Sequence, residues 1–411
     1  MAEQIVVVGG GAAGFFAAIA CGEASPGSAV SIFERGSQFL TKVRISGGGR
    51  CNVTHAREEP LEFSRRYPRG QRELISPLHR FDADDAVAWF EARGVALKME
   101  SDGRIFPVSD SSATIVDCLL REAASAGVNL FNRRGIERID RTETGQFVAT
   151  DTNGDTILCD RVLLATGGAR NAQAVQLARA LGHTTEPGVP SLFTFHAGAP
   201  WLRALPGVSM RDVALSVAES RLHERGPLLI THGGLSGPVV LRLSAWGARE
   251  LHEREYRFVL RINWTPDQSA DAILTELSAR RLTEPNRLVV NSPLSPLPTR
   301  LWDQLALAAG VATETRWTNL PRPQTLQLAQ RITRTELSIT GKSLNKDEFV
   351  TCGGVRLREI SFKTMESRIT PHLYFAGEIL DIDGITGGYN FQNAWTTGWI
   401  AGRAMAGLAP S

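Results

Sequence analysis

The sequence predicts an α/β fold that opens with a Rossmann-like βαβ unit, and three observations support this. Ile5–Val8 is a β-branched run, as in a strand buried on both faces of a parallel sheet. Gly9–Gly14 follows as a glycine-rich turn, and Phe15–Glu23 continues as an apolar, alanine-rich helix. A second apolar run, Ala29–Phe33, ends in Glu34. The order strand, glycine turn, helix, strand and acid is typical of a dinucleotide-binding βαβ unit.

Two later segments of the chain also contain a predicted strand followed by a glycine-rich turn. Gly135–Leu158 contains short apolar stretches separated by Thr-Gly and Asn-Gly turns, which predicts an antiparallel meander leading into the buried strand Val162–Ala165. Near the C-terminus, Leu373–Ala376 is a predicted strand, Gly377–Tyr389 a glycine-rich loop and Asn390–Met405 a helix. We expect these segments to join the opening unit in one domain.

The middle of the chain has a different composition. Residues 191–263 alternate in the manner of strands, whereas 264–335 have a helical pattern interrupted by prolines. We therefore expect three domains. A discontinuous nucleotide-binding domain comprises 1–190 and 345–411, a β-rich insertion comprises 191–263 and 336–344, and a helical insertion comprises 264–335.

Composition excludes several classes of protein. Of the 411 residues, 43% are hydrophobic and 21% charged, so a wholly disordered chain is excluded. Lys and Arg total 45 and Asp and Glu 43, a net charge of +2 that makes nucleic acid an unlikely partner. No apolar run approaches the roughly 18 residues that a membrane span needs. The five cysteines form no C-x-x-C pair, so we expect no metal site and a reducing, cytoplasmic setting.

The pattern Gly9-x-Gly11-x-x-Gly14 has a physical rationale as a dinucleotide site. The first glycine allows the tight turn, the second lets the backbone approach a pyrophosphate, and the third lets the helix pack closely on the strand. Amides and the positive dipole at the helix N-terminus hold the phosphates. Glu34 lies 20 residues after Gly14, where a carboxylate can accept hydrogen bonds from both ribose hydroxyls.

Three features favour FAD over NAD as the dinucleotide. The meander precedes a strand that ends in Ala165-Thr166-Gly167, an arrangement common in flavoproteins. The closing strand ends in Gly377-Glu378, with Asp381 and Asp383 beyond it to bond the pyrophosphate edge or the ribitol. A helix starting near Asn390 can direct its N-terminus at the flavin, where negative charge builds on reduction. The alternative is that Gly377–Gly388 is only a turn-rich loop.

Four longer motifs carry a specific resemblance. They are Lys42–Thr54 (KVRISGGGRCNVT), Gly103–Ser109 (GRIFPVS), Gly234–Pro238 (GLSGP) and Phe375–Asn390 (FAGEILDIDGITGGYN). With these motifs the chain resembles the YhiN/BaiN-like family of flavoproteins, within the two-dinucleotide-binding-domain superfamily. The resemblance implies a FAD-binding domain of the glutathione-reductase type, interrupted by a β-barrel-like module and a helical module.

The resemblance also implies that Lys42, Ser46, Gly47, Gly48, Arg50, Cys51 and Asn52 line the cofactor. Serial glycines let backbone amides face an anion or a ring, and the two basic residues offset phosphate charge; the alternative is a basic surface loop. With the motifs above, the candidate FAD contacts are Gly9, Gly11, Ala12, Ala13, Gly14, Glu34, Arg35, Lys42, Ser46, Gly47, Gly48, Arg50, Cys51, Asn52, Ile136, Ala165, Thr166, Gly167, Gly168, Gly377, Glu378, Asp381, Asp383, Gly387, Gly388, Tyr389, Asn390 and Phe391.

No residue stands out as the catalytic acid or base. Cys51 lies beside Arg50, which could lower its thiol pKa, but no resolving cysteine is near and a structural or flavin-contact role is favoured. His232 lies in a glycine loop that could cover the flavin, bind a nicotinamide or simply pack. His55 follows the flavin loop. Both histidines are weak candidates, each more often structural than catalytic.

These features predict a FAD-dependent oxidoreductase that passes a hydride between flavin N5 and a small organic substrate. The resemblance points to an NAD(P)H-linked reductase of an activated double bond, or to an oxidase of a small amine such as aminoacetone. A flavin-containing tRNA-modifying or nucleic-acid-binding protein is a further alternative. It would use the basic cluster of Arg65, Arg66, Arg69, Arg72 and Arg80, with Tyr67 between. A FAD-binding redox sensor without turnover is the last.

Overall fold

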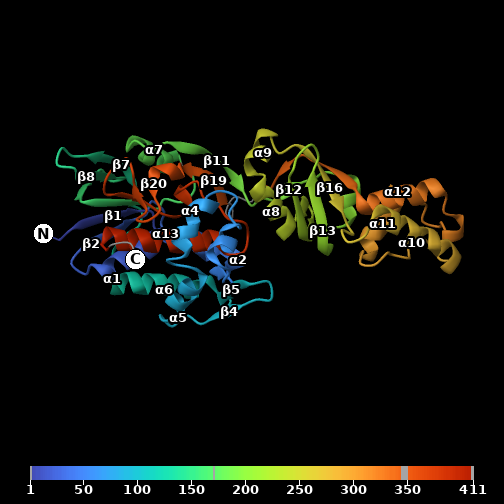
Figure 1. Cartoon of the computed structure of the whole chain (residues 1–411), viewed down its shortest axis with the longest axis horizontal. Coiled ribbons are helices and arrows are strands. Elements are labelled where there is room, and N and C mark those ends of the chain that lie inside the picture. Colours follow the sequence, from blue (N-terminus) through green and yellow to red (C-terminus); the bar gives the residue numbers. More distant parts are fainter. Residues whose placement is uncertain (1, 170–171, 344–349, 409–411) are drawn as a thin grey trace. The chain divides into compact units, whose positions relative to one another are not determined.

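The computed structural model describes residues 2–169, 172–343 and 350–408 and divides the chain into two compact units (Figure 1). The first unit comprises Met1–Ser191 and Asn345–Ser411, and the second comprises Leu192–Leu344. The chain passes from the first unit to the second after Ser191, one residue later than the 190/191 boundary expected from the sequence. The expected return at 344/345 falls outside the described residues.

A seven-stranded sheet forms the centre of the first unit, in the order β20-β21-β22-β10-β1-β2-β6. From β22 to β6 neighbouring strands pair in parallel, and β20 and β21 add an antiparallel edge. Ile5–Val8 of β1 is at most 4% exposed, as expected for a strand covered on both faces. The predicted α/β fold is confirmed. The strands are β1 (Gln4–Val8), β2 (Ala29–Phe33), β6 (Asn129–Phe131), β10 (Arg161–Leu164), β20 (Ile360–Ser361), β21 (Glu366–Ser367) and β22 (Leu373–Phe375).

Helices α1 (Ala12–Ala24) and α13 (Tyr389–Met405) pack directly on one another. Two glycines of α13 permit the close approach: a Cβ on Gly398 would lie 2.7 Å from the Ala13 carbonyl oxygen, and one on Gly402 would lie 2.3 Å from that of Ala17. The two helices therefore form a packed pair, although more than 360 residues separate them in sequence.

Smaller elements complete the first unit. Two three-stranded antiparallel sheets have the orders β3-β5-β4 and β7-β8-β9, and β11 pairs with β19. The strands are β3 (Thr54–His55), β4 (Leu97–Met99), β5 (Arg104–Pro107), β7 (Ile136–Arg141), β8 (Phe147–Asp151), β9 (Thr156–Cys159), β11 (Thr185–Ser191) and β19 (Val350–Val355). The helices are α2 (Thr41–Gly49), α3 (Pro60–Ser64), α4 (Gln71–Leu78), α5 (Ala83–Glu91), α6 (Ser112–Ser125), α7 (Ala172–Ala180), η3 (Leu357–Glu359) and η4 (Gly377–Ile379).

The second unit combines an antiparallel sheet with helices. Seven strands follow the order β17-β16-β13-β14-β15-β12-β18. Helices α10, α11 and α12 lie beside one another (Figure 1), around the fully buried Trp302 and Trp317. The strands are β12 (Phe195–His196), β13 (Ser209–Val217), β14 (His223–Thr231), β15 (Gly234–Ser236), β16 (Phe258–Asn263), β17 (Thr335–Ile339) and β18 (Gly341–Lys342). The helices are η1 (Pro200–Ala204), α8 (Pro238–Trp246), α9 (Ala248–Glu253), α10 (Ala270–Thr283), α11 (Thr299–Ala308), η2 (Trp317–Asn319) and α12 (Arg322–Thr333).

Within the described ranges, no helix combines the length and the apolar character that crossing a bilayer would require.

Candidate functional site

Parallel pairing brings the predicted motifs to one edge of the main sheet. Strands β1, β2, β10 and β22 all point the same way, so their carboxyl ends lie together. The segments that follow these ends are Gly9–Gly14, Glu34, Ala165–Gly168 and Gly377-Glu378. In open α/β sheets this edge is where dinucleotides bind. Four segments that are far apart in sequence therefore form one candidate cofactor site.

The three glycines of the opening turn have different surroundings. Gly9 has a φ of +112°, and a Cβ there would lie 2.4 Å from the Ala165 carbonyl oxygen. A Cβ on Gly14 would lie 2.0 Å from the carbonyl oxygen of Gly9. A Cβ on Gly11 would meet no heavy atom within 4 Å. Gly9 and Gly14 are thus needed by the protein's own packing, whereas Gly11 leaves open space at the start of α1, as a pyrophosphate requires.

The carboxylate of Glu34 is held at this turn. One oxygen accepts from the Gly10 amide at 2.8 Å and the other from the Gly36 amide at 2.6 Å. Helix α1 begins after Gly11, which has no side chain to cap the first amides, and its first turn contains no acidic residue. An uncapped helix N-terminus favours an anion, and the anchored carboxylate beside it retains lone pairs for ribose hydroxyls. Both features fit the adenosine half of FAD.

Next along the edge, Lys42 and Glu378 form an ion pair at 2.5 Å. The second oxygen of Glu378 accepts from the Thr351 amide at 2.8 Å. Sequence reasoning missed Thr351, because β19 reaches this edge only through tertiary structure. Nearby, the Thr166 hydroxyl is buried and finds no hydrogen-bond partner among the described residues. A bound cofactor would supply that partner.

The last residues of α2 depart from right-handed helical geometry. Gly47, Gly48 and Gly49 have φ values of +58°, +68° and +83°, and all three are exposed. This left-handed run is inexpensive only for glycine, and it leaves exposed backbone without side chains that an anion can approach. The Ser46 hydroxyl donates to the Val43 carbonyl at 3.0 Å, which stabilises the bend.

Arg50 and Cys51, which follow these glycines, are held by contacts within the protein. Arg50 pairs with Glu100 at 2.7 Å and Asp110 at 3.4 Å, and its guanidinium lies 4.0 Å from the Phe106 ring centroid, so its charge is already neutralised. Cys51 is fully buried, and burial raises the pKa of its thiol to about 12, a shift that the Ser46 hydroxyl opposes. A buried thiol with this pKa is not a nucleophile.

Asn52 and His55 hold the start of α13. Asn52, with its amide oriented to satisfy both groups, accepts from the Gly388 amide at 2.9 Å and donates to the Thr54 carbonyl at 2.9 Å. The His55 Nδ1 lies 3.1 Å from the Gly387 carbonyl, and its ring stacks on Tyr389. Burial lowers the pKa of His55, so the ring is neutral and donates from Nδ1. Its observed contacts are those of a positioning residue.

Residues 66–70 brace the loop that precedes α13, here residues 382–388. The Ile385 amide donates to the Arg66 carbonyl at 2.9 Å, and the Tyr67 hydroxyl donates to the Tyr389 carbonyl at 2.6 Å. Arg69 forms an ion pair with Asp383, whose carboxyl group also accepts from the Ser191 hydroxyl at 2.6 Å. Asp383 is fully buried. Its carboxyl group therefore shapes the loop from within, which differs from its expected role as a direct cofactor ligand.

The remaining candidates are distributed as follows. Asn390 pairs through its amide with both main-chain groups of Gly384, and Phe391 stacks on Trp395. Ala12 and Ala13 form the first turn of α1, Gly387 and Gly388 precede α13, and Asp381 lies half-buried in the loop before α13. Ile136 is buried in β7, and Arg35 is exposed beside Glu137. His232 belongs to the second unit, where it is exposed in the turn between β14 and β15.

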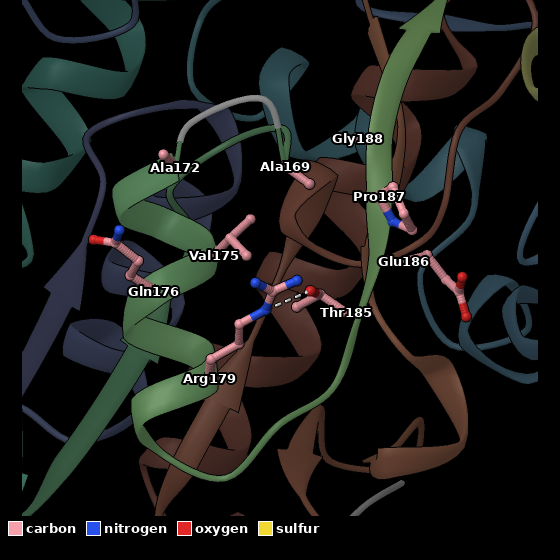
Figure 2. A pocket seen from close by; sticks show the side chains of 9 residues that line it. All are labelled: Ala169, Ala172, Val175, Gln176, Arg179, Thr185, Glu186, Pro187 and Gly188. Atoms are coloured by element: carbon pink, nitrogen blue, oxygen red, sulfur yellow. Dashed lines mark hydrogen bonds between the residues drawn. The ribbon is translucent and has the colours of Figure 1, made fainter. Parts of the chain in front are cut away.

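A pocket that the sequence did not predict lies between α7 and β11 (Figure 2). Its volume is about 430 Å³, and its lining includes the apolar Ala169, Val175 and Pro187. Arg179 reaches toward Thr185 and donates to its hydroxyl at 3.0 Å (Figure 2). The described residues contain no group of three or more His, Cys, Asp or Glu side chains arranged to hold a metal ion.

Comparison with known proteins shows the family of the chain. The family model described as "HI0933-like protein Rossmann domain" matches residues 3–404, nearly the whole chain. The chain belongs to this family. The family, the motifs and the cofactor edge agree with the predicted resemblance and identify the protein as a FAD-dependent oxidoreductase.

Curated relatives of the family differ in the substrates that their names state. A ribosomal RNA dihydrouridine synthase of Escherichia coli (strain K12) is 32% identical over 410 residues, which are 97% of each chain. A 3-dehydro-bile acid delta(4,6)-reductase of Clostridium scindens is 29% identical over 412 residues, covering 98% of this chain and 99% of the relative. A second ribosomal RNA dihydrouridine synthase, from Haemophilus influenzae, is 28% identical over 415 residues, which are 98% of each chain.

Solved structures support the fold alone. A 3-ketosteroid delta1-dehydrogenase from Sterolibacterium denitrificans matches with a TM-score of 0.51 at 12% identity, covering 98% of this chain and 99% of that one. A flavocytochrome c3 fumarate reductase in an open conformation matches with a TM-score of 0.50 at 15% identity, covering 99% of this chain and 78% of that one.

Proposed function

We propose that this protein reduces a carbon–carbon double bond conjugated to a carbonyl group, and that its substrate is uridine in ribosomal RNA. The observation that carries the proposal is a chemistry common to differently named relatives. Dihydrouridine is uridine whose ring C5=C6 bond, conjugated to a carbonyl, has been saturated. The bile-acid relative is named for reducing double bonds at positions 4 and 6 of a 3-keto steroid. In both reactions one carbon gains a hydride and the other a proton.

The residues at the sheet edge support this chemistry through binding and orientation. When FAD is bound and reduced, the chemistry that it supplies is hydride donation from N5. Glu34 and the amides at the start of α1 would hold the adenosine diphosphate, and Lys42 would offset phosphate charge. Asn52 and His55 fix the first turn of α13, whose positive end favours the anionic reduced ring.

Uridine in ribosomal RNA is favoured as the substrate for two reasons. Two relatives with this name each align over nearly their whole length. The charge of this chain is also unevenly divided. The second unit contains 18 Arg and Lys against 13 Asp and Glu, a net of +5, whereas the first has 27 against 30, a net of −3. A basic unit attracts a polyanion even when the whole chain is nearly neutral.

The bile-acid relative supports a second candidate function, reduction of a steroid-like dienone. It covers this chain as completely as the RNA-modifying relatives do, at 29% identity. Each double bond that is saturated consumes two electrons, and we propose NADH or NADPH as their source. An amine oxidase would instead use O₂ and need no nicotinamide.

The test uses the purified FAD-bound protein without O₂. Transcribed, unmodified ribosomal RNA and a 3-keto-4,6-diene steroid are offered separately, with NADH or NADPH, and products are detected by mass spectrometry of nucleosides or of steroid. We expect dihydrouridine in the RNA and flavin bleaching by one nicotinamide. If the steroid is reduced and no dihydrouridine forms, the second candidate function, reduction of a steroid-like dienone, replaces the first. Turnover of neither substrate, with a flavin that nicotinamides leave oxidised, would overturn the proposal.

A further inference from the structure

We infer that one end of the helical part of the second unit binds the phosphate backbone of RNA. This surface, called the arginine end below, comprises the last turn of α10, residues 284–291 and residues 314–319. The inference rests on the proposed function, because it assumes an RNA substrate. It also extends that function, because it names the part of the second unit that would contact the RNA.

At least seven of the 17 arginines of the second unit form ion pairs with carboxylates. Arg225 pairs with Asp212 and Asp267, Arg242 pairs with Glu224, and Arg261 pairs with Glu336. Such pairs cancel most of the charge that a phosphate would experience. The net charge of +5 must therefore be sought in arginines whose partners are neutral.

Arg281 and Arg316 are two such arginines, and they lie together. Arg281 donates from Nη2 to the Thr318 carbonyl at 3.1 Å, and Arg316 donates from Nη1 to the Asn286 carbonyl at 2.6 Å. Both are exposed, and neither forms an ion pair with a carboxylate in the part of the chain that the structure describes. A carbonyl fixes the direction of a guanidinium without cancelling its charge, and the other N–H groups stay available.

Backbone hydrogen bonds hold the two segments that carry these anchors. The Thr318 amide donates to the Pro285 carbonyl at 3.1 Å, and the Trp317 amide donates to the Arg287 carbonyl at 3.1 Å. The fully buried Trp317 lies below, with the Arg280 guanidinium 5.5 Å from its ring centroid. Arg281 and Arg316 are thus attached reciprocally to a rigid pair of segments, and little side-chain entropy remains to be lost on binding.

The composition of the arginine end also suits RNA. It contains four arginines, of which Arg280 pairs with Glu276 and Arg287 with Glu284, so that Arg281 and Arg316 carry the charge without a carboxylate partner among the described residues. Leu282 beside them is 87% exposed, the largest value among the exposed large hydrophobic side chains of the described residues. Arginine forks bind phosphate oxygens in pairs, and an apolar side chain between them can cover a sugar or an unstacked base.

In the basic cluster that the sequence suggested, three of the five arginines are compensated by carboxylates, whereas Arg72 and Arg80 form no ion pair with a carboxylate among the described residues. Arg65 pairs with Glu62, Arg66 pairs with Glu58, and Arg69 pairs with the buried Asp383. These arginines contribute to the structure of the first unit, and their charge is already compensated.

The test compares two double variants of the full-length FAD-bound protein. R281Q/R316Q removes two arginines anchored by carbonyls, whereas R225Q/R261Q removes two that are paired with carboxylates. Binding of transcribed ribosomal RNA is measured from 50 to 300 mM KCl, with dihydrouridine formation, the thermal midpoint and flavin reduction by nicotinamide alongside. For R281Q/R316Q we expect the slope of log K against log salt to fall by about 1.4–2, corresponding to two lost phosphate contacts. We expect the thermal midpoint and flavin reduction to stay at the wild-type values.

Each outcome decides between the hypotheses. If the slopes of both double variants equal that of the wild type while the wild type forms dihydrouridine, the arginine end is wrong and the proposed function stands. If R281Q/R316Q loses stability and its salt dependence is unchanged, the two arginines serve only the fold and the inference is overturned. If the wild-type protein neither binds nor modifies the RNA, the proposed function and this surface fall together.

Discussion

Arg69 and Asp383, 314 positions apart in sequence, form an ion pair inside the first unit. Asp383 is completely buried, and the Arg69 side chain is only 12% exposed. The Ser191 hydroxyl donates to the same carboxylate, and Ser191 is the last residue before the chain crosses into the second unit. The pair thus joins the loop before α13 to the crossing point, at the side of the cofactor site where α13 begins.

Removing Arg69 is expected to destabilise the first unit strongly. R69M keeps much of the apolar stem but leaves Asp383 buried with only the Ser191 hydroxyl as a partner, and an uncompensated buried charge costs about 3–5 kcal/mol. The measurement is urea unfolding of the FAD-bound protein. R72M is the control, because Arg72 is exposed on α4 and its loss should cost no more than about 0.5 kcal/mol. Equal midpoints for the two variants would contradict the buried pair.

The glycine turn gives a second prediction, in which two neighbouring substitutions fail in different ways. G14A places a Cβ 2.0 Å from the Gly9 carbonyl oxygen, so we expect the fold itself to lose about 1–3 kcal/mol. G11A meets no heavy atom within 4 Å and has an ordinary φ of −94°, so the FAD-free protein should unfold as the wild type does. Its Cβ would occupy the space expected for the pyrophosphate.

Flavin titration followed by fluorescence separates the two cases. For G11A we expect a weakening of FAD affinity of about tenfold or more, equivalent to about 1.4 kcal/mol. Unchanged FAD affinity in G11A would show that the pyrophosphate does not approach this glycine.

The cofactor edge could be predicted because its determinants are local. The spacing of Gly9, Gly11 and Gly14 and the acid at position 34 specify a turn, a helix start and a strand end within one short segment. Parallel pairing of β1 with β2 and β10 then brings the other motifs to the same edge. Once the strands are known to be parallel, the motifs that follow them must lie at the same edge of the sheet.

The expected roles of Asp383 and Arg50 differ from their observed contacts because their partners are distant in sequence. Asp383 resembles an available carboxylate until Arg69 is seen to neutralise it and the Ser191 hydroxyl to donate to it. Arg50 resembles a phosphate ligand until Glu100 and Asp110 are seen beside it. The whole-chain charge also conceals an uneven distribution. A net of +2 is the sum of two units with opposite signs, and a total for the whole chain does not show this division.

Cys51 should be chemically inert in the native protein. Its side chain is fully buried, and burial raises the pKa of its thiol to about 12, so thiolate is scarce at neutral pH. Iodoacetamide is expected to leave Cys51 unmodified in the folded protein and to alkylate it after denaturation, as shown by peptide mass spectrometry. The flavin of the C51S variant should be reduced by NADH or NADPH at the wild-type rate. Rapid labelling of native protein, or loss of flavin reduction in C51S, would restore Cys51 as a redox residue.

The buried His183 is expected to make the protein sensitive to mild acid. Its Nδ1 lies 3.0 Å from Glu359 and its Nε2 lies 2.8 Å from the Ser367 hydroxyl. Burial lowers the pKa of His183 below its ordinary value of 6.5, against the opposing effect of Glu359. Burial raises the pKa of Glu359, but hydrogen bonds from Thr184 and His183 outweigh it, and the net pKa lies below 4.5.

Both shifts act in the same direction. Below pH 6.5 the unfolded chain binds the His183 proton more readily than the folded one, so the free energy of unfolding falls as the pH drops from about 6.5 toward the folded pKa. Below pH 4.5 the loss of the Glu359 contribution adds to this fall. In H183Q the fall below pH 6.5 should flatten, because the titrating group is gone, whereas H79Q, at an exposed position of the first unit, should follow the wild type. Urea unfolding between pH 5 and 8 measures all three proteins, and an H183Q curve parallel to that of the wild type would refute a role for this histidine in acid sensitivity.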